Sequence, residues 1–528
     1  MIKKQLYKVF VIASLTAGLS SCDGDLLETI PNDRISTAIF WKTPDDALLA
    51  VNSLYNDLEG SIFLYDALTD IAHVNQPFNI NAYIEQGNYD ALNTTVYNQW
   101  ANAYKGIAAV NYFLENVEKV SFPDDNLLKR YKAEAKVLRA YQYIKLVTLY
   151  GDVPLVRETL TLEASRKITR TPASEVWNFI DQELEEVTTN NWLPDAYDAK
   201  NQGRITKWAA WGLKARAALY AGNYRKAAEA ANQIIGSNKF SLYPNYEKLF
   251  SYAAENNSEI LLDKQYINSN NVFESLGPYS QKNAQSSYVP TKALVDLYQT
   301  ADGKDIKDEG SGYNSDHPYD NRDSRLYFSI FLDGDILPNG NVFHPAPNSG
   351  TPDAVGVTYI ASTTGFNIKK YVNNEDYANP SNSGINIILL RYAEILLTYT
   401  EAKIELHEID QSVYNALNLV RNSRVDVKLP SVASHTEEEL REIVRRERTV
   451  ELAFEGLHLA DIRRWRTGER VIPGSIFGIT YTDNTGIIRV VQTSTTRAFN
   501  PERDYLWPVP QKERDLNPNL TQNNKWGN

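Results

Sequence analysis

The chain contains almost no sulfur. Cys22 is the only cysteine among 528 residues, and Met1 is the only methionine. A lone cysteine cannot close a disulfide within the chain or build a cysteine-ligated metal cluster, so the fold must be stabilised by its core alone. A chain of this length buries enough of its unfolded surface to do that. The composition therefore excludes a small disulfide-stabilised scaffold.

Positive charge is also scarce. The 66 Asp and Glu residues outnumber the 54 Lys and Arg residues, and the formal net charge is −12. Between Thr43 and Tyr104 there is no Lys or Arg. Because nucleic-acid binding depends on Lys and Arg contacts to phosphates, we expect no nucleic-acid partner. For the same reason, the cation-free segment is a poor site for phosphate or sulfate.

Long apolar runs are missing as well, and the one short run lies at the N-terminus. Lys3, Lys4 and Lys8 precede an uncharged stretch from Val9 to Leu19. This layout is typical of a secretory signal, and the stretch is shorter than the roughly 20 residues that cross a bilayer. The sequence therefore predicts a signal peptide over residues 1–21.

The residues around the predicted cleavage site resemble a bacterial lipobox. Leu19-Ser20-Ser21 leads directly into Cys22, whose thiol is acylated in such lipoproteins. We therefore predict lipidation at Cys22 and a lipidated tether over residues 22–40. The acidic Asp23-Gly24-Asp25 that follows resembles a signal for export to the cell surface. The expected location is the outer membrane, with the protein lipid-anchored and facing the cell exterior.

Apolar periodicity predicts helices along much of the chain. A capping Thr43 followed by Pro44 predicts a helix from Asp45 to about Glu59. Further helices are expected from Trp100, over Tyr131–Leu149 and over Ser174–Glu186. Residues 208–235 have the spacing of a tetratricopeptide repeat, with a tight turn at Gly222. Similar helix pairs are expected around residues 100–149 and 391–421, and such pairs must stack to bury their apolar faces.

Two segments show no sustained period. Residues 60–100 are rich in Asn, and residues 268–384 are rich in Asn, Gly, Pro, Asp and Tyr. Aperiodic segments of this length are usually functional or mobile. Farther on, residues 478–496 read as a β-hairpin with its turn at Asp483-Asn484-Thr485-Gly486. The expected fold is mainly α, with a tetratricopeptide-like scaffold and a loop-rich half that contains a few short strands.

The sequence offers little catalytic or cofactor chemistry. It contains no phosphate loop, dinucleotide fingerprint, nucleophile elbow or paired-histidine zinc motif, so we expect no cofactor. Glu447, Glu451 and Glu455 are spaced to share one face of a helix, as paired glycosidase carboxylates would. Because several arginines flank them, including Arg445, Arg446 and Arg448, an ion-pair network is the favoured interpretation. Asp302, Asp305 and Asp308 are weak calcium candidates, for which a solvated acidic loop is favoured.

Aromatic and amide side chains in the aperiodic segments are the better ligand candidates. Sugar rings present C–H faces that pack on aromatic rings, and Asn or Asp side chains can bind sugar hydroxyls. On location and residue type alone, the candidate ligand-binding residues are Asn75, Phe78, Tyr83, Tyr89, Tyr279, Tyr288, Tyr313 and His317.

Separate motifs in consistent order resemble the SusD/RagB family. In the N-terminal half they are Trp100-x3-Tyr104, Ala133-Glu134-Ala135, Arg139-Ala140-Tyr141 and Tyr150-Gly151-Asp152-Val153-Pro154. In the C-terminal half they are Leu390-Arg391-Tyr392-Ala393-Glu394, Val420-Arg421-Asn422-Ser423-Arg424, Arg446-Glu447-Arg448, Glu451 to Gly456, Asp461 to Trp465, Trp507-Pro508-Val509-Pro510 and Leu516 to Asn523. The expected regions are an N-terminal SusD-like helical region over 41–250 and a C-terminal region over 251–528.

The resemblance implies a surface lipoprotein that captures glycan and delivers it to a SusC-like TonB-dependent outer-membrane transporter. It implies no catalysis, and the matching motifs carry no ligand residues to this chain. The expected ligand is a neutral oligosaccharide or polysaccharide. A peptide-capturing lid of a RagB-like uptake system is the first alternative, and a secreted glycoside hydrolase that uses Glu447 and Glu451 is the second. A purely structural adaptor is a further alternative.

Overall fold

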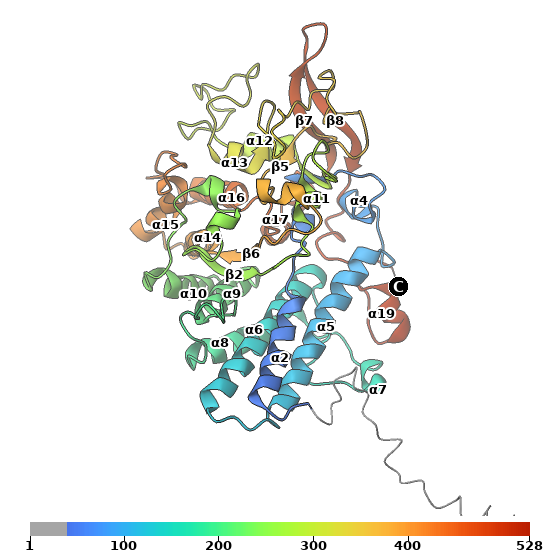
Figure 1. The fold of residues 1–528 in the computed structure, drawn as a ribbon, viewed down its shortest axis with the longest axis vertical. Helices are drawn as coiled ribbons and strands as arrows, with labels where there is room; N and C mark the ends of the chain where they lie inside the picture. The colour runs from blue at the N-terminus through green and yellow to red at the C-terminus, as the bar shows by residue number, and fades with distance from the viewer. Residues whose placement is uncertain (1–39, 528) are drawn as a thin grey trace, which may run out of the picture.

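The computed structural model describes residues 40–527 (Figure 1). The predicted signal peptide, Cys22 and the tether up to residue 39 lie outside these residues. The described chain is mainly helical, which confirms the predicted fold class, and its strands form two-stranded antiparallel sheets. Long helices occupy the lower part of Figure 1, and loops, short elements and a projecting hairpin occupy the upper part.

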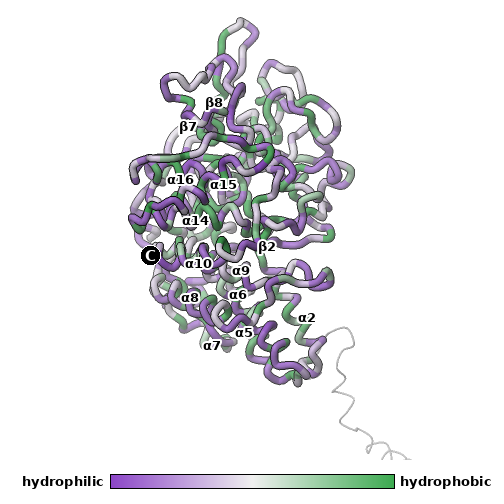
Figure 2. Tube along the Cα trace, turned by 90° about the vertical axis from the view of Figure 1, so that its left-hand side faces the viewer, coloured by the Kyte–Doolittle hydropathy of each residue, from purple (hydrophilic) through white to green (hydrophobic). Residues whose placement is uncertain are grey.

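The N-terminal helices are α2 (Pro44–Leu54), α5 (Thr94–Val117), α6 (Asp125–Tyr150), α7 (Leu162–Ser165) and α8 (Ala173–Thr189). Four of them were predicted from periodicity, although α2 ends at Leu54 rather than near Glu59 and α5 begins at Thr94, before Trp100; the short α7 was not predicted. Helix α2 begins with a capping box in which Thr43 and Asp46 bind each other's backbone N–H groups, with Pro44 in the first turn. Hydrophilic and hydrophobic residues both occur along the helices in Figure 2, and in α8 the buried side chains recur every three or four residues, as amphipathic packing requires.

The predicted tetratricopeptide-like pair over residues 208–235 is confirmed. It consists of α9 (Lys207–Tyr220) and α10 (Tyr224–Gly236), and the turn between them contains Gly222 at φ 73°. The second predicted pair consists of α14 (Tyr392–Glu405) and α15 (Gln411–Asn422), followed by α16 (Glu437–Glu451). Neighbouring helices pack in the series α5, α6, α8, α9, α10, α14, and α14 also packs on α15 and α16. The stacked pairs therefore form one continuous scaffold.

The two aperiodic segments contain only short elements. Residues 60–100 hold α3 (Phe63–Ala67), β1 (Ala72–Val74), α4 (Ile80–Glu85) and the first turns of α5. Residues 268–384 hold α11 (Val272–Leu276), β3 (Tyr288–Pro290), α12 (Lys292–Leu297), α13 (Arg325–Ser329), β4 (Ile330–Phe331) and β5 (Asn367–Ile368). Strands β1 and β3 pair antiparallel, so the two segments meet at this sheet.

The remaining elements connect the loop-rich half to the scaffold. Strand β2 (Ile260–Lys264) pairs with β6 (Ile387–Arg391), which leads directly into α14. The chain continues through α17 (His458–Trp465) and α18 (Gly468–Val471) into the hairpin of β7 (Gly474–Thr482) and β8 (Ile488–Arg497), and ends with α19 (Gln511–Leu516). The hairpin confirms the strand prediction and projects at the top of Figure 1.

The C-terminal segment packs back against the N-terminal helices. The Trp507 backbone N–H donates to the Leu149 carbonyl at 2.8 Å, and the Asn523 side-chain amide donates to the Tyr150 carbonyl at 2.8 Å. The Trp507 ring is buried and makes an edge contact with Tyr150. The core therefore extends through both halves. None of the helices described between residues 40 and 527 is both long and apolar enough to span a bilayer.

One glycine fixes the hairpin to the second aperiodic segment. The backbone N–H of Ile479 in β7 donates to the Thr364 carbonyl at 2.8 Å. The neighbouring Gly478 lies so close that an added Cβ atom would stand 1.9 Å from that carbonyl oxygen. Only glycine allows this approach without moving the backbone.

We predict that Gly478→Ala lowers the free energy of unfolding by about 1–3 kcal/mol, because overpacking forces the two segments apart. Chemical denaturation followed by circular dichroism measures the change. Gly236→Ala is the matched control, since Gly236 ends α10 and a Cβ there meets nothing within 4 Å. Equal stability of the Gly478 variant and the unchanged protein would contradict this prediction.

Candidate functional site

The candidate catalytic carboxylates are buried in an ion-pair network. Glu447 is 2% exposed and lies 2.6 Å from Arg325 and 2.7 Å from Arg421. Glu451 is fully buried and contacts Arg391 at 2.7 Å, Arg325 at 2.9 Å and Arg424 at 3.0 Å. Both carboxylates are occupied by arginines and closed to solvent. The predicted ion-pair interpretation is therefore confirmed.

The prediction that Glu447, Glu451 and Glu455 share one helix face was wrong for Glu455. Helix α16 ends at Glu451 and Phe454 has φ 64°, so Glu455 lies beyond the helix. Glu455 still joins the network through Arg391 at 2.6 Å and Lys370 at 2.9 Å.

The partners also differ from the flanking arginines named from the sequence. The network draws on Arg325, Lys370, Arg391, Arg421 and Arg424, which come from other elements. The flanking Arg448 pairs instead with Asp461 at 2.8 Å. The arginines closest in sequence to Glu447 and Glu451 bind other groups, because the partners of these buried carboxylates are determined by how distant segments pack together.

The network holds Glu451 in its charged form. Burial by itself would raise the pKa of Glu451, but the guanidinium groups of Arg424, Arg391 and Arg325 outweigh burial and hold that pKa far below its usual 4.5. A glycosidase acid must be protonated near neutral pH to donate its proton. Glu451 does not meet this requirement, and its oxygens face arginines rather than a cavity.

The acidic candidates for calcium are not gathered into a site. Asp305 Oδ1 accepts the Lys307 N–H at 3.1 Å, and Asp308 Oδ2 accepts the Asp305 N–H at 3.0 Å. Asp302 is exposed and lies 3.5 Å from the Lys304 ammonium. Within residues 40–527, no cluster of three or more His, Cys, Asp or Glu side chains could hold a metal ion. Asp305 and Asp308 thus bind the backbone of their own loop, Asp302 accepts from the Thr300 hydroxyl, and Asp305 also pairs with Arg446 of α16 at 3.4 Å.

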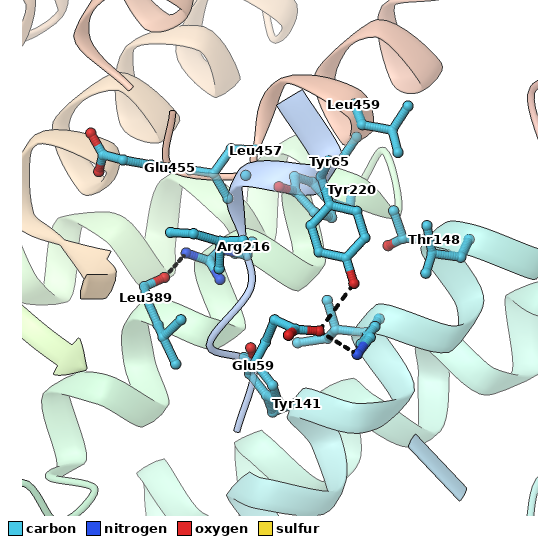
Figure 3. Close-up of a pocket in the computed structure, with 16 residues that line it drawn as sticks. Glu59, Tyr65, Tyr141, Thr148, Arg216, Tyr220, Leu389, Glu455, Leu457 and Leu459 are labelled. Carbon is cyan, nitrogen blue, oxygen red and sulfur yellow. Dashed lines mark hydrogen bonds and ion pairs between the residues drawn. The ribbon is translucent and has the colours of Figure 1, made fainter. Parts of the chain in front are cut away.

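A small cavity lies between the scaffold and the turn after α16 (Figure 3). Its volume is about 100 Å³, below the roughly 300–1,000 Å³ of small-molecule pockets. Within it, Lys145 Nζ donates to Glu59 Oε2 at 2.7 Å, and the Tyr65 hydroxyl donates to the same carboxylate at 3.2 Å. Arg216 also donates to the Leu389 carbonyl, as drawn in Figure 3, whereas the hydroxyls of Thr148 and Tyr220 have no hydrogen-bond partner among residues 40–527. This cavity is too small to hold an oligosaccharide.

An exposed aromatic pair marks a better candidate. Phe78 and Tyr359 are 81% and 57% exposed, and their ring centroids lie 5.9 Å apart at an interplanar angle of 79°. One ring comes from each aperiodic segment. Exposed apolar groups gathered in this way mark interaction sites more often than single exposed side chains do. We call Phe78 and Tyr359 the aromatic platform.

Asn75 holds the two loops of the aromatic platform together. Its amide nitrogen donates to the carbonyls of Ile360 and Ala361, each at 3.1 Å, and its amide oxygen accepts the Thr363 N–H at 2.7 Å. The Asn75 side chain is 1% exposed. Asn75 therefore lies next to the aromatic platform, but its side chain is buried. Its hydrogen bonds hold the platform loops together and leave it unavailable to a ligand.

A third loop, residues 279–285, lies beside the platform loops. The Gln76 side chain donates to the Gln285 carbonyl at 3.1 Å, and the Ser280 N–H donates to Asp353 Oδ1 at 2.8 Å. Tyr279 belongs to this loop and is half-buried. Tyr288 follows the same loop in β3, where it pairs with Val74. The structure thus brings Asn75, Phe78, Tyr279 and Tyr288 into one region.

The other four predicted ligand-binding residues, Tyr83, Tyr89, Tyr313 and His317, take no part in the hydrogen bonds and strand pairing that join the platform loops. Tyr83 is 44% exposed on α4, and Tyr89 packs on Trp526 with ring centroids 4.7 Å apart. Tyr313 packs beside Arg322 at 5.5 Å, and His317 is exposed on the same connection between α12 and α13. Tyr359 was not among the candidates, because only its place in the second aperiodic segment distinguishes it in the sequence.

Comparisons with known proteins place these observations in a family. Residues 247–526 match the SusD family model, and residues 44–219 match a model described as starch-binding associating with outer membrane. SusD-like protein P2 of Formosa agariphila is 27% identical over 98% of this chain and 99% of its own. Starch-binding protein SusD of Bacteroides thetaiotaomicron is 27% identical over 47% of this chain and 48% of its own.

Solved structures agree with the sequence relatives. The crystal structure of a SusD-like carbohydrate binding protein from Bacteroides fragilis covers 91% of this chain and 100% of its own, with a TM-score of 0.83 and 29% identity. A laminarin binding SusD-like protein matches with a TM-score of 0.71 and 20% identity, a likeness of fold.

We predict that Glu451→Gln lowers the free energy of unfolding at neutral pH by about 3–5 kcal/mol, because it leaves buried arginines unpaired. The folded-state pKa of Glu451 is depressed below 4.5, so its contribution is complete above that pH and is lost as the pH falls. The stability difference should therefore narrow toward about pH 3. Glu442→Gln is the control, since Glu442 is exposed on the same helix. Equal denaturation midpoints for the Glu451 and Glu442 variants would refute the conclusion that the ion pairs of Glu451 stabilise the fold.

Proposed function

Because this chain belongs to the SusD family, we propose that it captures a neutral oligosaccharide at the aromatic platform without cleaving it. The single observation that carries the proposal is the exposed Phe78–Tyr359 pair, which Asn75 assembles from the two aperiodic segments. Ring faces open to solvent can pack on the C–H faces of a sugar, and flat aromatic side chains lose little conformational freedom on binding. The similar Bacteroides fragilis structure is described as a carbohydrate binding protein, which is consistent with this ligand class.

The charge of the site supports a neutral ligand. Phe78 belongs to the stretch between Thr43 and Tyr104 that contains no Lys or Arg. Phosphate and sulfate groups are usually held by such cations, so the Phe78 segment offers a charged glycan no partner. Lys282 of the neighbouring loop donates to the Ala378 carbonyl at 2.8 Å.

The buried carboxylates support binding rather than hydrolysis. Glu447 and Glu451 are closed to solvent and held by arginines, so neither can reach a glycosidic bond. The glycoside-hydrolase alternative relied on Glu447 and Glu451, and neither of them is available as a catalytic acid.

We further propose that the protein acts as a lid that delivers its ligand to a SusC-like TonB-dependent transporter. One relative is a starch-binding protein, and the family model that matches the N-terminal region is described as associating with the outer membrane. A lipid on Cys22 would hold the protein at that membrane, with the described body of the chain outside the bilayer.

Removing either ring of the aromatic platform should weaken ligand binding. We predict that Phe78→Ala and Tyr359→Ala each cost about 1 kcal/mol or more, roughly a fivefold loss of affinity, without unfolding the protein. Isothermal titration calorimetry with neutral oligosaccharides from plant, host and fungal sources measures the loss. The control is Tyr112→Ala, which removes an exposed ring on α5. Unchanged affinity in both platform variants, or binding of peptides and of no glycan, would reject the proposal.

Lipidation should depend on the single thiol. We predict that Cys22→Ser abolishes incorporation of labelled palmitate and moves the protein from the outer-membrane fraction to the soluble fraction. Ser21→Ala is the control, because it leaves the thiol and a small residue before it. Retention of Cys22→Ser protein in the outer-membrane fraction, with label still incorporated, would show that the anchor lies elsewhere.

A further inference from the structure

An apolar groove opens between α5, α7 and α19, which lie together at the lower right of Figure 1. Its volume is about 360 Å³, within the roughly 300–1,000 Å³ of pockets that hold small molecules. Most of its lining is apolar, including Ile107, Leu160, Leu162, Ile168, Leu516 and Leu520. Leu162 is 70% exposed and Leu516 is 55% exposed. Large apolar side chains gathered in an open groove mark an interaction surface.

Hydrogen bonds between the walls hold the groove in shape. The side-chain amide of Asn517, after α19, donates to the carbonyls of Ser165 and Ile168 at 3.3 Å and 2.8 Å. On the opposite wall, the Tyr104 hydroxyl of α5 donates to the Pro154 carbonyl at 2.7 Å. The groove is therefore formed before anything binds in it, which lowers the entropic cost of filling it.

The floor of the groove is a stripe of α5 that continues toward the first described residues. Trp100, Tyr104 and Ala108 line the groove at four-residue spacing, so they share one face of the helix. Tyr112 is the next residue of this stripe, and Trp41 makes an edge contact with it, with ring centroids 6.1 Å apart. Only one helical turn, about 5.4 Å, separates this contact from the groove. The chain that precedes Trp41 therefore starts beside the groove.

One carboxylate of the groove lacks a partner. Glu513 is half-buried, and burial raises the pKa of Glu513 despite the positive charge of Lys512. Lys512 lies over the Tyr97 ring at 4.3 Å, and no residue between 40 and 527 donates a hydrogen bond to the Glu513 carboxylate. Glu158 and Arg166 lie on the exposed rim and carry opposite charges. The groove therefore suits an apolar segment that carries a cation.

Residues 30–39 have this composition. They contain three large apolar side chains, Ile30, Ile35 and Ile39, and one cation, Arg34. Ten extended residues reach at most about 36 Å. The floor from Ala108 to Trp100 covers eight residues of α5, about 12 Å. The segment is therefore long enough to cross the groove from the Trp41 side.

We propose that residues 30–39 dock in this groove, with isoleucine side chains against Leu162 and Leu516 and with Arg34 paired to Glu513. The apolar contacts remove exposed leucine surface from water, and the ion pair gives the unpartnered carboxylate a guanidinium. No residue of the aromatic platform takes part, so the docking does not depend on glycan capture.

Docking would shorten the connection to the lipid predicted on Cys22. Residues 22–39 are an 18-residue linker that spans at most about 65 Å, whereas residues 22–29 alone span at most about 29 Å. With the segment docked, the face formed by α5, α7 and α19 stays close to the anchor. The groove would thereby set which side of the body lies nearest the membrane.

Disulfide formation within the chain tests the docking. The chain from residue 22 onward carries Cys22→Ser, so that two engineered thiols are the only ones. Ile30→Cys, Ile35→Cys and Ile39→Cys are each combined with Leu162→Cys in the groove or with Leu49→Cys on α2. Leu49 is the matched control, because it is 60% exposed and lies only eight residues after Trp41, within reach of the same segment.

At least one of the three positions should form the groove disulfide roughly fivefold faster than the control disulfide, because docking raises the effective concentration of the two thiols. Non-reducing electrophoresis and peptide mass mapping measure the rates. Glu513→Arg should slow the groove disulfide by a similar factor, and adding Arg34→Glu should restore it.

The contrary results are distinct from those for glycan binding. Equal rates with both partners, disulfides that form only between copies, or a Glu513→Arg effect that Arg34→Glu does not reverse would overturn the docking. Loss of oligosaccharide affinity in the platform variants bears only on the proposed function.

Discussion

The buried ion-pair network around Glu451 is the interaction on which the rest of the structure depends. Arg391, at the end of β6, contacts Glu259, Glu451 and Glu455 at 2.6–2.8 Å. It thereby joins the sheet of the loop-rich half to the end of α16 in the scaffold. Taking such charges out of water is expensive, and Arg424 Nε and Nη1 have no hydrogen-bond partner among residues 40–527, so the network repays that cost only in part. The network therefore specifies one arrangement of the two halves more than it adds stability.

That arrangement lets the aperiodic segments meet. With the halves fixed, β1 pairs with β3, and Asn75 reaches the carbonyls of Ile360 and Ala361. The base of the hairpin is fixed in the same region, because Arg497 pairs with the buried Glu85 of α4. An irregular surface built on rigid supports can present Phe78 and Tyr359 in a constant geometry. Such preorganisation lowers the entropic cost of binding.

The sequence predicts the parts of this fold that depend on neighbouring residues. Helices α6, α9 and α10 and the β7–β8 hairpin follow from periodicity, caps and turn residues within short windows. The ion-pair partners of Glu447 could not be found in this way, because Arg325 lies in a different segment and meets it only after folding. The arginines near Glu447 in the sequence were the predicted partners, but the folded chain pairs Glu447 with Arg325 and Arg421 instead.

The candidate site shows the same limit. Residue type and location led to Phe78, but its partner Tyr359 lies in the other aperiodic segment, and no local pattern links the two rings. Asn75 was chosen as a residue able to bind hydroxyls, and its hydrogen bonds instead join segments 285 positions apart in the sequence. A side chain that positions a binding loop and one that binds ligand look alike in a sequence, because both are polar residues outside regular elements.

The most direct test of the central claim is a crystal structure of the full chain with a bound neutral oligosaccharide. We predict intact glycan with a sugar ring packed on Phe78 or Tyr359, the Asn75 contacts unchanged, and the carboxylates around Glu451 still paired with arginines. Glycan seated elsewhere with the platform empty, or a cleaved product beside Glu447 and Glu451, would contradict the account.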